Sequence, residues 1–191
     1  MIVNTVIYTC IIFLLILAGI TLFLLLRIKH FRMLSETDQM TSLMNYRGLY
    51  RNIEKLLRSK TPFILAIIDI DNFRIFNEKS YKLGDTVLKE FAALLHKSFA
   101  EEALIARFRI GDEFVIVFRA TEPEKAKIRI KQFKETCNAY KFNCLTDFNT
   151  HTISFSEGLV EVNSKIISID MLFSEAEAAL KTIKTTKDTY K

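Results

Sequence analysis

The stretch from Ala103 to Phe118, ALIARFRIGDEFVIVF, places the tightest constraint on how this chain folds. Two apolar, β-prone runs flank a short polar break at residues 109–113, and the Gly-Asp pair in that break predicts the turn of a β-hairpin. The second run, residues 114–118, shows no alternation of polar and apolar side chains, which predicts a strand buried on both faces. We therefore expect the rest of the chain to pack around this hairpin.

Two adjacent carboxylates, Asp112 and Glu113, stand at the tip of the predicted hairpin. An isolated Gly-Asp-Glu turn is more often a solvated acidic turn than a metal site. A second acidic pair, Asp69 and Asp71, closes the apolar run of residues 63–68, and a divalent metal is the usual reason to gather carboxylates on rigid structure. If the strand continues through both aspartates they share a face, and if it ends at Asp69 then Asp71 belongs to the turn. We expect Asp69 to share a metal with Asp112.

The chain opens with an uncharged apolar run, Ile2 to Leu26. A helix of about 25 residues, at about 1.5 Å per residue, is long enough to cross a hydrocarbon core of about 30 Å. A cleaved signal peptide would carry its positive charges before the apolar run, whereas here Arg27, Lys29 and Arg32 follow it. The positive-inside rule then predicts a single-pass anchor in the inner (cytoplasmic) membrane, with the N-terminus outside and the remainder in the cytoplasm.

The sequence therefore divides into three predicted segments: a transmembrane anchor at residues 1–26, a cytoplasmic stalk at 27–40, and one folded domain at 41–191. The stalk contains no Gly or Pro, so it can continue the membrane helix. The formal net charge of +5 is mild and partly clustered beside the membrane segment. We therefore expect the membrane, and no nucleic acid, as a partner.

Periodicity within the domain predicts alternating strands and helices. We expect helices over 47–57, 122–137 and 170–187, the last with Asp170 or Ser174 as N-cap. We expect Gly84 to mark the junction between two further helices, and strands in two pieces around Gly158. This order is typical of an α/β domain, more specifically an α+β fold of palm or ferredoxin-like type, with a central, mostly antiparallel sheet and flanking helices.

Four segments, taken in order, match the motifs of one family. They are Asp38–Leu49 (D-x-L-T-G-L-x-N-R-R-x-F in the family), Asp69–Glu78 (D-I-D-x-F-K-x-I-N-D), Gly84-Asp85-x-x-Leu88, and Ile110-Gly111-Asp112-Glu113-Phe114. Together they resemble the GGDEF domain family, the diguanylate cyclases, over roughly the last four-fifths of the chain. Each motif alone is weak, and their common order makes the resemblance strong.

The resemblance implies an enzyme that condenses two GTP molecules into cyclic di-GMP, each 3′-hydroxyl attacking the other α-phosphate with release of pyrophosphate. It implies Mg²⁺ (or Mn²⁺) as cofactor and a homodimer with facing sites, because one protomer binds one nucleotide. By the same resemblance Asp112 and Glu113 are catalytic, and the metal is held by Asp69, Asp112, Glu113 and the Ile70 carbonyl.

The resemblance also assigns residues to the nucleotide. The amides of Phe73 and Arg74, together with Lys184, would receive the phosphates, and Gly111 lies in the turn that cradles them. Asn77 and Asp85 would read the guanine edge, since an amide and a carboxylate can pair with its N–H and amino donors.

Several positions depart from the family pattern. Ile110 stands where the first glycine of the signature belongs, and the same letters can be read as a one-residue deletion. The segment between Asn77 and Asp85 is one residue shorter than in the family, the arginine expected at Asp188 is absent, and the product-inhibition motif R-x-x-D has no counterpart. These departures favour an alternative: a catalytically degenerate GGDEF-like module that dimerises or binds nucleotide to regulate a partner.

Overall fold

The computed structural model describes residues 2–109, 111–146, 152–162 and 168–189, and it divides into two compact units, Met1–Glu36 and Thr37–Lys191. The first unit is one helix, α1 (Ile2–Glu36), which continues without a break through residues 27–36. Its part Ile11–Glu36 is long and apolar enough to cross a membrane. A signal sequence meets the same two criteria, so the membrane anchor and its orientation stay predictions.

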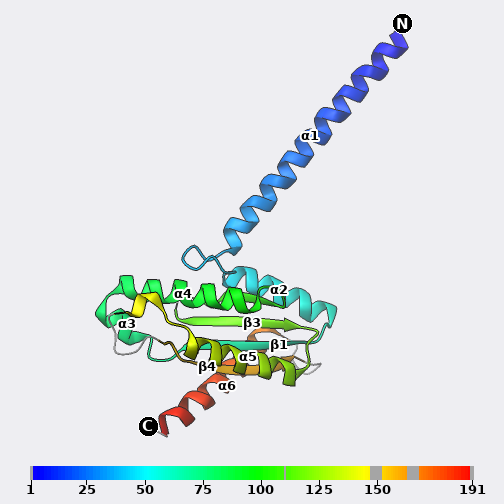
Figure 1. Cartoon of the computed structure of the whole chain (residues 1–191). Coiled ribbons are helices and arrows are strands. Elements are labelled where there is room, and N and C mark those ends of the chain that lie inside the picture. Colours follow the sequence, from blue (N-terminus) through cyan, green and yellow to red (C-terminus); the bar gives the residue numbers. More distant parts are fainter. Residues whose placement is uncertain (1, 110, 147–151, 163–167, 190–191) are drawn as a thin grey trace. The chain divides into compact units, whose positions relative to one another are not determined.

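The second unit is a four-stranded antiparallel sheet flanked by helices (Figure 1). The strands lie in the order β2-β3-β1-β4, and each neighbouring pair is antiparallel. In chain order the elements are α2 (Tyr46–Ser59), β1 (Phe63–Ile70), α3 (Arg74–Lys79), α4 (Tyr81–Phe99), β2 (Ala103–Arg107), β3 (Glu113–Arg119), α5 (Pro123–Ala139), the 3₁₀ turn η1 (Asn143–Leu145), β4 (Phe155–Val162) and α6 (Ile169–Thr189). The predicted α+β fold and the predicted hairpin are confirmed.

The central strand β1 explains how the two faces of the sheet are covered. All eight of its residues are buried. Because side chains alternate along a strand, Ile64 and Ile68 pack into one apolar cluster with residues of α4 and α5, whereas Leu65 and Ile67 pack into a second with residues of α2 and α6. Asp69 continues the second set, so the strand periodicity directs it to the face that α6 covers.

Two local predictions at the C-terminal end were wrong. Residues 155–162 form the single strand β4, with Gly158 inside it. A Cβ atom at Gly158 would lie 2.5 Å from the Ala176 carbonyl oxygen and 2.5 Å from the Leu180 amide nitrogen, so the glycine permits α6 to pack closely on the strand. Helix α6 is capped by Ser168, whose Oγ accepts a hydrogen bond from the Met171 amide at 3.1 Å.

Gly84 does not mark the junction between α3 and α4. That junction is Ser80, which has an extended backbone and an Oγ that accepts from the Leu83 amide at 3.1 Å. Gly84 lies in the first turn of α4, where a Cβ atom would come within 1.9 Å of Asn77 Oδ1. The absence of a side chain at Gly84 therefore leaves room for the Asn77 side chain between the two helices.

Candidate active site

The pairing of β1 with β3 brings the two acidic segments of the sequence together. The antiparallel register places Asp69 opposite Glu113. Just beyond the paired residues, the Ile70 amide donates a hydrogen bond to the Asp112 carbonyl oxygen at 3.3 Å. Asp69 is buried, with 8% of its surface exposed, and Asp112 and Glu113 are partly buried. We call Asp69, Asp112 and Glu113 the acid cluster.

The acid cluster carries more negative charge than its surroundings neutralise. Burial raises the pKa of Asp112, and the neighbouring Asp69 raises it further. The pKa of Glu113 is raised by the same two causes in the same order. The described cation in direct contact with the cluster is Lys184 of α6, whose Nζ lies 2.6 Å from Asp69 Oδ1. A further cation would therefore stabilise the ionised cluster.

Asp71 has a different environment although it follows Asp69 by only two positions. Strand β1 ends at Ile70, so Asp71 belongs to the turn, as the second of the two sequence alternatives proposed. Its carboxylate accepts hydrogen bonds from Ser154 Oγ at 2.8 Å and from Ser156 Oγ at 2.7 Å. Asp71 thus ties the end of β1 to β4, and Asp69 is the aspartate that lies in the acid cluster.

The donor chemistry of the acid cluster suits a hard divalent cation, which prefers carboxylate, carbonyl and phosphate oxygens. Within the described ranges, no three His, Cys, Asp or Glu side chains gather closely enough to form a metal site by themselves. A metal at Asp69 and Asp112 would take its remaining ligands from the Ile70 carbonyl, from water or from phosphate. That donor set fits Mg²⁺, which usually keeps only one or two carboxylate ligands.

A buried arginine holds the other side of the hairpin turn. Arg107 Nε and Nη2 donate to the Gly111 carbonyl oxygen at 3.0 and 2.9 Å, and Nη1 lies 3.4 Å from Asp38 Oδ1. The same Asp38 oxygen accepts hydrogen bonds from the Thr41 amide at 2.9 Å and from Thr41 Oγ1 at 2.7 Å. Burial opposes ionisation of Asp38, but the bonds from Thr41 and the charge of Arg107 outweigh it and lower the pKa. We call this set of residues the Arg107 network.

Sequence reasoning missed the Arg107 network. The available signal was an arginine at the end of the apolar run of β2, because a buried guanidinium requires acceptors. With 7% of its surface exposed, Arg107 links the N-terminal Asp38 motif to the turn that carries the acid cluster.

Helix α6 also contacts the turn through Arg109. Arg109 has a positive φ of 55°, its guanidinium pairs with Glu177 at 2.9 Å, and it lies over the Phe108 ring at 4.6 Å from the ring centre. Ile110, the departure from the family signature, lies outside the described residues. The effect of Ile110 on the turn therefore stays a prediction.

The predicted nucleotide residues lie on α3 and α4. Phe73 is the buried N-cap residue of α3, and Arg74 opens that helix with an exposed side chain that pairs with Glu78 at 2.7 Å. Asn77 lies against Gly84, which precedes Asp85, so the packing of α3 on α4 makes the two predicted base-reading residues neighbours. The assignment of these residues to a nucleotide stays a prediction.

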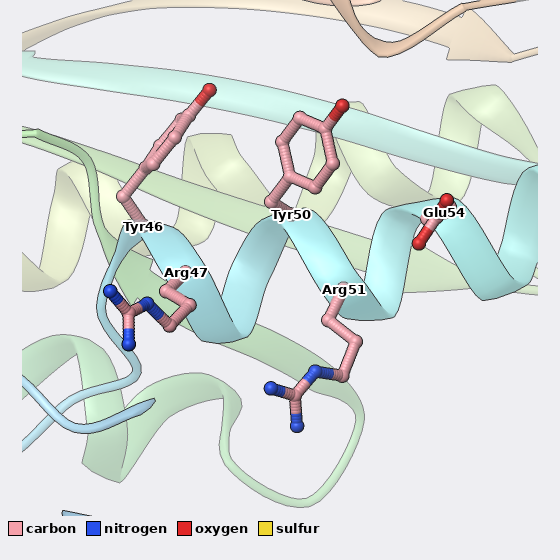
Figure 2. A pocket seen from close by; sticks show the side chains of 5 residues that line it. All are labelled: Tyr46, Arg47, Tyr50, Arg51 and Glu54. Carbon is pink, nitrogen blue, oxygen red and sulfur yellow. The ribbon is translucent and has the colours of Figure 1, made fainter. Parts of the chain in front are cut away.

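A separate surface depression of about 340 Å³ lies on α2, lined by Tyr46, Arg47, Tyr50, Arg51 and Glu54. Figure 2 shows the two tyrosine rings directed to one side of the helix and the two arginines to the other. The Tyr46 ring packs at 5.6 Å from Phe108. None of the predicted site residues lines this depression.

An antiparallel sheet with carboxylates on its central strands defines a domain of the palm type. Residues 35–189 match the family described as "Diguanylate cyclase, GGDEF domain", and the chain belongs to the GGDEF family.

Curated relatives agree with this assignment. Diguanylate cyclase DgcP of Pseudomonas aeruginosa is 32% identical over 112 residues, which make up 56% of this chain and 16% of DgcP. The probable diguanylate cyclase DgcT of Escherichia coli is 23% identical over 156 residues, 80% of this chain and 34% of DgcT. The chain thus spans only a minor part of the length of both relatives.

A solved structure shows the same fold. The coiled coil and GGDEF domain of DgcB from Caulobacter crescentus, in complex with c-di-GMP, is similar to this chain with a TM-score of 0.73. The two share 22% sequence identity, and the match covers 88% of this chain and 91% of that one.

Proposed function

We propose that the chain is a membrane-anchored diguanylate cyclase that condenses two GTP molecules into cyclic di-GMP and pyrophosphate, depends on Mg²⁺ and acts as a dimer. The observation that carries this proposal is the acid cluster, because the β1–β3 register brings Asp69 to the signature carboxylates Asp112 and Glu113. The membrane anchor rests on the apolar helix α1 and the basic residues that follow its apolar run.

Under this proposal the residues of the acid cluster and the Arg107 network have separate roles. Asp69 and Asp112 would hold the metal, with Glu113 and the Ile70 carbonyl, and the metal supplies charge neutralisation on the triphosphate and a lower pKa for the attacking hydroxyl. Arg107 would keep the turn in place through the Gly111 carbonyl oxygen.

Binding of the nucleotide would orient the reaction. The Phe73 and Arg74 amides and Lys184 would receive phosphates, and Asn77 with Asp85 would read the base. Two facing protomers would then hold each 3′-hydroxyl against the α-phosphorus of the other nucleotide, which converts a bimolecular encounter into an oriented one.

The test uses the full chain in detergent micelles, incubated with Mg²⁺ and each of the four common ribonucleoside triphosphates. Products are separated by chromatography and identified by mass. We expect a cyclic dinucleotide from GTP, absent in Asp112→Ala and retained in Glu124→Ala, which removes an exposed carboxylate of α5 that pairs with Lys127. A product from another nucleotide would revise the base.

A second proposal is a catalytically degenerate GGDEF-like module that dimerises or binds nucleotide to regulate a partner. It is favoured by the Ile110 substitution and the missing arginine at Asp188. A folded chain that gives no product from any nucleotide, at high protein concentration, would support this second proposal over the first.

A further inference from the structure

The ion pair between Lys184 and Asp69 affects how a metal ion would bind to the acid cluster. Lys184 Nζ lies 2.6 Å from Asp69 Oδ1, within the distance of a charge-assisted hydrogen bond. The Asp69 side chain is 11% exposed and that of Lys184 is 41% exposed. The carboxylate is therefore fixed by the sheet, whereas the lysine keeps a solvated and flexible stem.

A divalent metal would compete with Lys184 for the same carboxylate. Mg²⁺ binds carboxylate oxygens at about 2.0–2.1 Å, so a metal on Oδ1 would occupy the position from which the ammonium group donates. A metal on Oδ2 would still lie within a few ångströms of the ammonium group, and like charges repel strongly at a buried carboxylate. Lys184 must leave Asp69 before a metal can bind there tightly.

A triphosphate offers Lys184 a new partner. Under the proposed function Lys184 receives phosphate oxygens, and its four-carbon stem can turn from the fixed carboxylate to a phosphate nearby. Removing one lysine from the acid cluster while adding a metal exchanges one positive charge for two.

We propose that Lys184 couples metal binding to nucleotide binding by exchanging partners. In the nucleotide-free protein its ammonium group neutralises Asp69 and weakens the binding of a divalent cation. A bound triphosphate takes the ammonium group, and the metal then binds to the freed carboxylate. This inference rests on the proposed function, because it needs the acid cluster to take a metal and Lys184 to take phosphate. The coupling is reciprocal, so a bound metal also frees Lys184 for the nucleotide.

The experiment measures Mn²⁺ binding rather than turnover. Free Mn²⁺ is titrated by electron paramagnetic resonance in the full chain in detergent. Each titration is done without nucleotide and with a GTP analogue that has a methylene bridge between the α and β phosphorus atoms and cannot release pyrophosphate.

We expect Lys184→Met, which keeps the length of the side chain without its charge, to bind Mn²⁺ about tenfold more tightly than wild type when nucleotide is absent. Lys184→Arg keeps the charge and should stay at the wild-type value. The control is Lys181→Met, an exposed residue one turn earlier on α6 that forms no ion pair with a described residue. We expect it to change Mn²⁺ affinity by less than about twofold, because solvated charges are well screened.

Two results would overturn the inference, and they differ in meaning. If wild type and Lys184→Met bind Mn²⁺ equally without nucleotide while Asp112→Asn abolishes binding, the metal site stands and the exchange of partners is wrong. If no variant binds Mn²⁺ with or without the analogue, the metal site of the proposed function fails together with the exchange.

Discussion

The two sides of the hairpin turn at residues 108–113 differ in how fully their charges are neutralised. On one side the Arg107 network pairs a buried cation with a carbonyl oxygen and with Asp38, so each charge has a partner of the opposite sign or dipole. On the other side Lys184 pairs directly with Asp69, whereas burial and the neighbouring Asp69 carboxylate raise the pKa values of Asp112 and Glu113. A network whose hydrogen-bonding groups are all paired makes the local structure rigid, whereas a cluster with unneutralised negative charge favours binding of a cation.

The pKa directions express the same difference. The pKa of Asp38 is lowered, so the folded state favours its ionised form. The pKa values of Asp112 and Glu113 are raised, by burial first and by Asp69 second, so folding disfavours their ionised forms. One side of the turn therefore stabilises the fold at neutral pH, and the other costs stability that a bound cation would restore.

The largest expected effect is the loss of turnover when Asp112 is changed. Asp112→Ala removes a metal ligand under the proposed function, so we expect cyclisation activity to fall by at least about a hundredfold. The isosteric Asp112→Asn should lose activity to a similar extent. It should leave stability unchanged or raise it by up to about 1 kcal/mol, because it removes a like charge near Asp69. Urea unfolding and product analysis on the same preparations separate the two effects, and a clear loss of stability in Asp112→Asn would contradict the assignment.

The next effect lies on the other side of the turn and concerns stability. Arg107→Ala leaves the Gly111 carbonyl and Asp38 without their buried donor, so we expect the free energy of unfolding to fall by about 2–4 kcal/mol. Arg107→Lys keeps the charge but not the paired donors, and should recover only part of this loss. The measurement is urea denaturation of the full chain in detergent, followed by circular dichroism.

The matched control for Arg107 is Arg58→Ala on α2. The Arg58 side chain is 78% exposed and pairs with Glu54 at 2.8 Å. Exposed pairs of this kind contribute at most about 1 kcal/mol. Equal losses of stability in the two variants would show that the Arg107 network does not hold the domain together.

A smaller effect, of about 1 kcal/mol or less on each side, should appear in the pH dependence of stability. A lowered pKa contributes stability that is present above the unfolded value and lost as the pH falls through the folded value. Wild type should therefore exceed Asp38→Asn at neutral pH, and this advantage should shrink below about pH 4.

The contribution of the acid cluster to stability should depend on pH in the opposite direction. Carboxyl groups with raised pKa values destabilise the fold above those values, and this cost disappears as the pH falls towards the ordinary carboxyl range. Any advantage of Asp112→Asn over wild type at neutral pH should therefore vanish on acidification to about pH 4. The free energy of unfolding, measured between pH 4 and 8 without divalent metal for wild type, Asp38→Asn and Asp112→Asn, tests both expectations. Parallel pH profiles for the two variants would contradict the proposed difference between the two sides of the turn.

Most of the fold was predictable because its signals are local. The unbroken apolar run of residues 114–118 predicted a strand buried on both faces, and the periodicity of residues 122–137 predicted helix α5. Gly84 and Gly158 were misread as breaks, since a glycine in the sequence does not show whether it serves a turn or a close contact. Gly84 leaves room for the Asn77 side chain and Gly158 leaves room for the backbone of α6, and both contacts depend on the packing of separate elements.

The site was predictable only in part for the same reason. The motif around Asp69 and the Gly-Asp-Glu turn are visible in the sequence, and their meeting follows from the β1–β3 register. The partners of Asp71 are Ser154, just before β4, and Ser156 within it, and Arg107 meets Asp38 across a separation of 69 residues. Contacts between such distant segments depend on the assembled sheet, and no local periodicity indicates them.

The smallest expected effect tests the turn between the two sides. Ile110 carries a β-branched side chain where the family places glycine, and it stands next to Arg109, whose φ is positive. Ile110→Gly, or a glycine inserted after Ile110, should raise cyclisation activity or nucleotide affinity a few-fold by reopening the space that glycine leaves for phosphates. The added backbone freedom should lower stability by up to about 1 kcal/mol. Steady-state kinetics and binding of the GTP analogue report the gain, and Thr121→Gly, in the loop after β3, controls for flexibility alone. If neither glycine variant changes activity or affinity, the turn tolerates Ile110, and the interpretation of Ile110 as an unfavourable substitution is wrong.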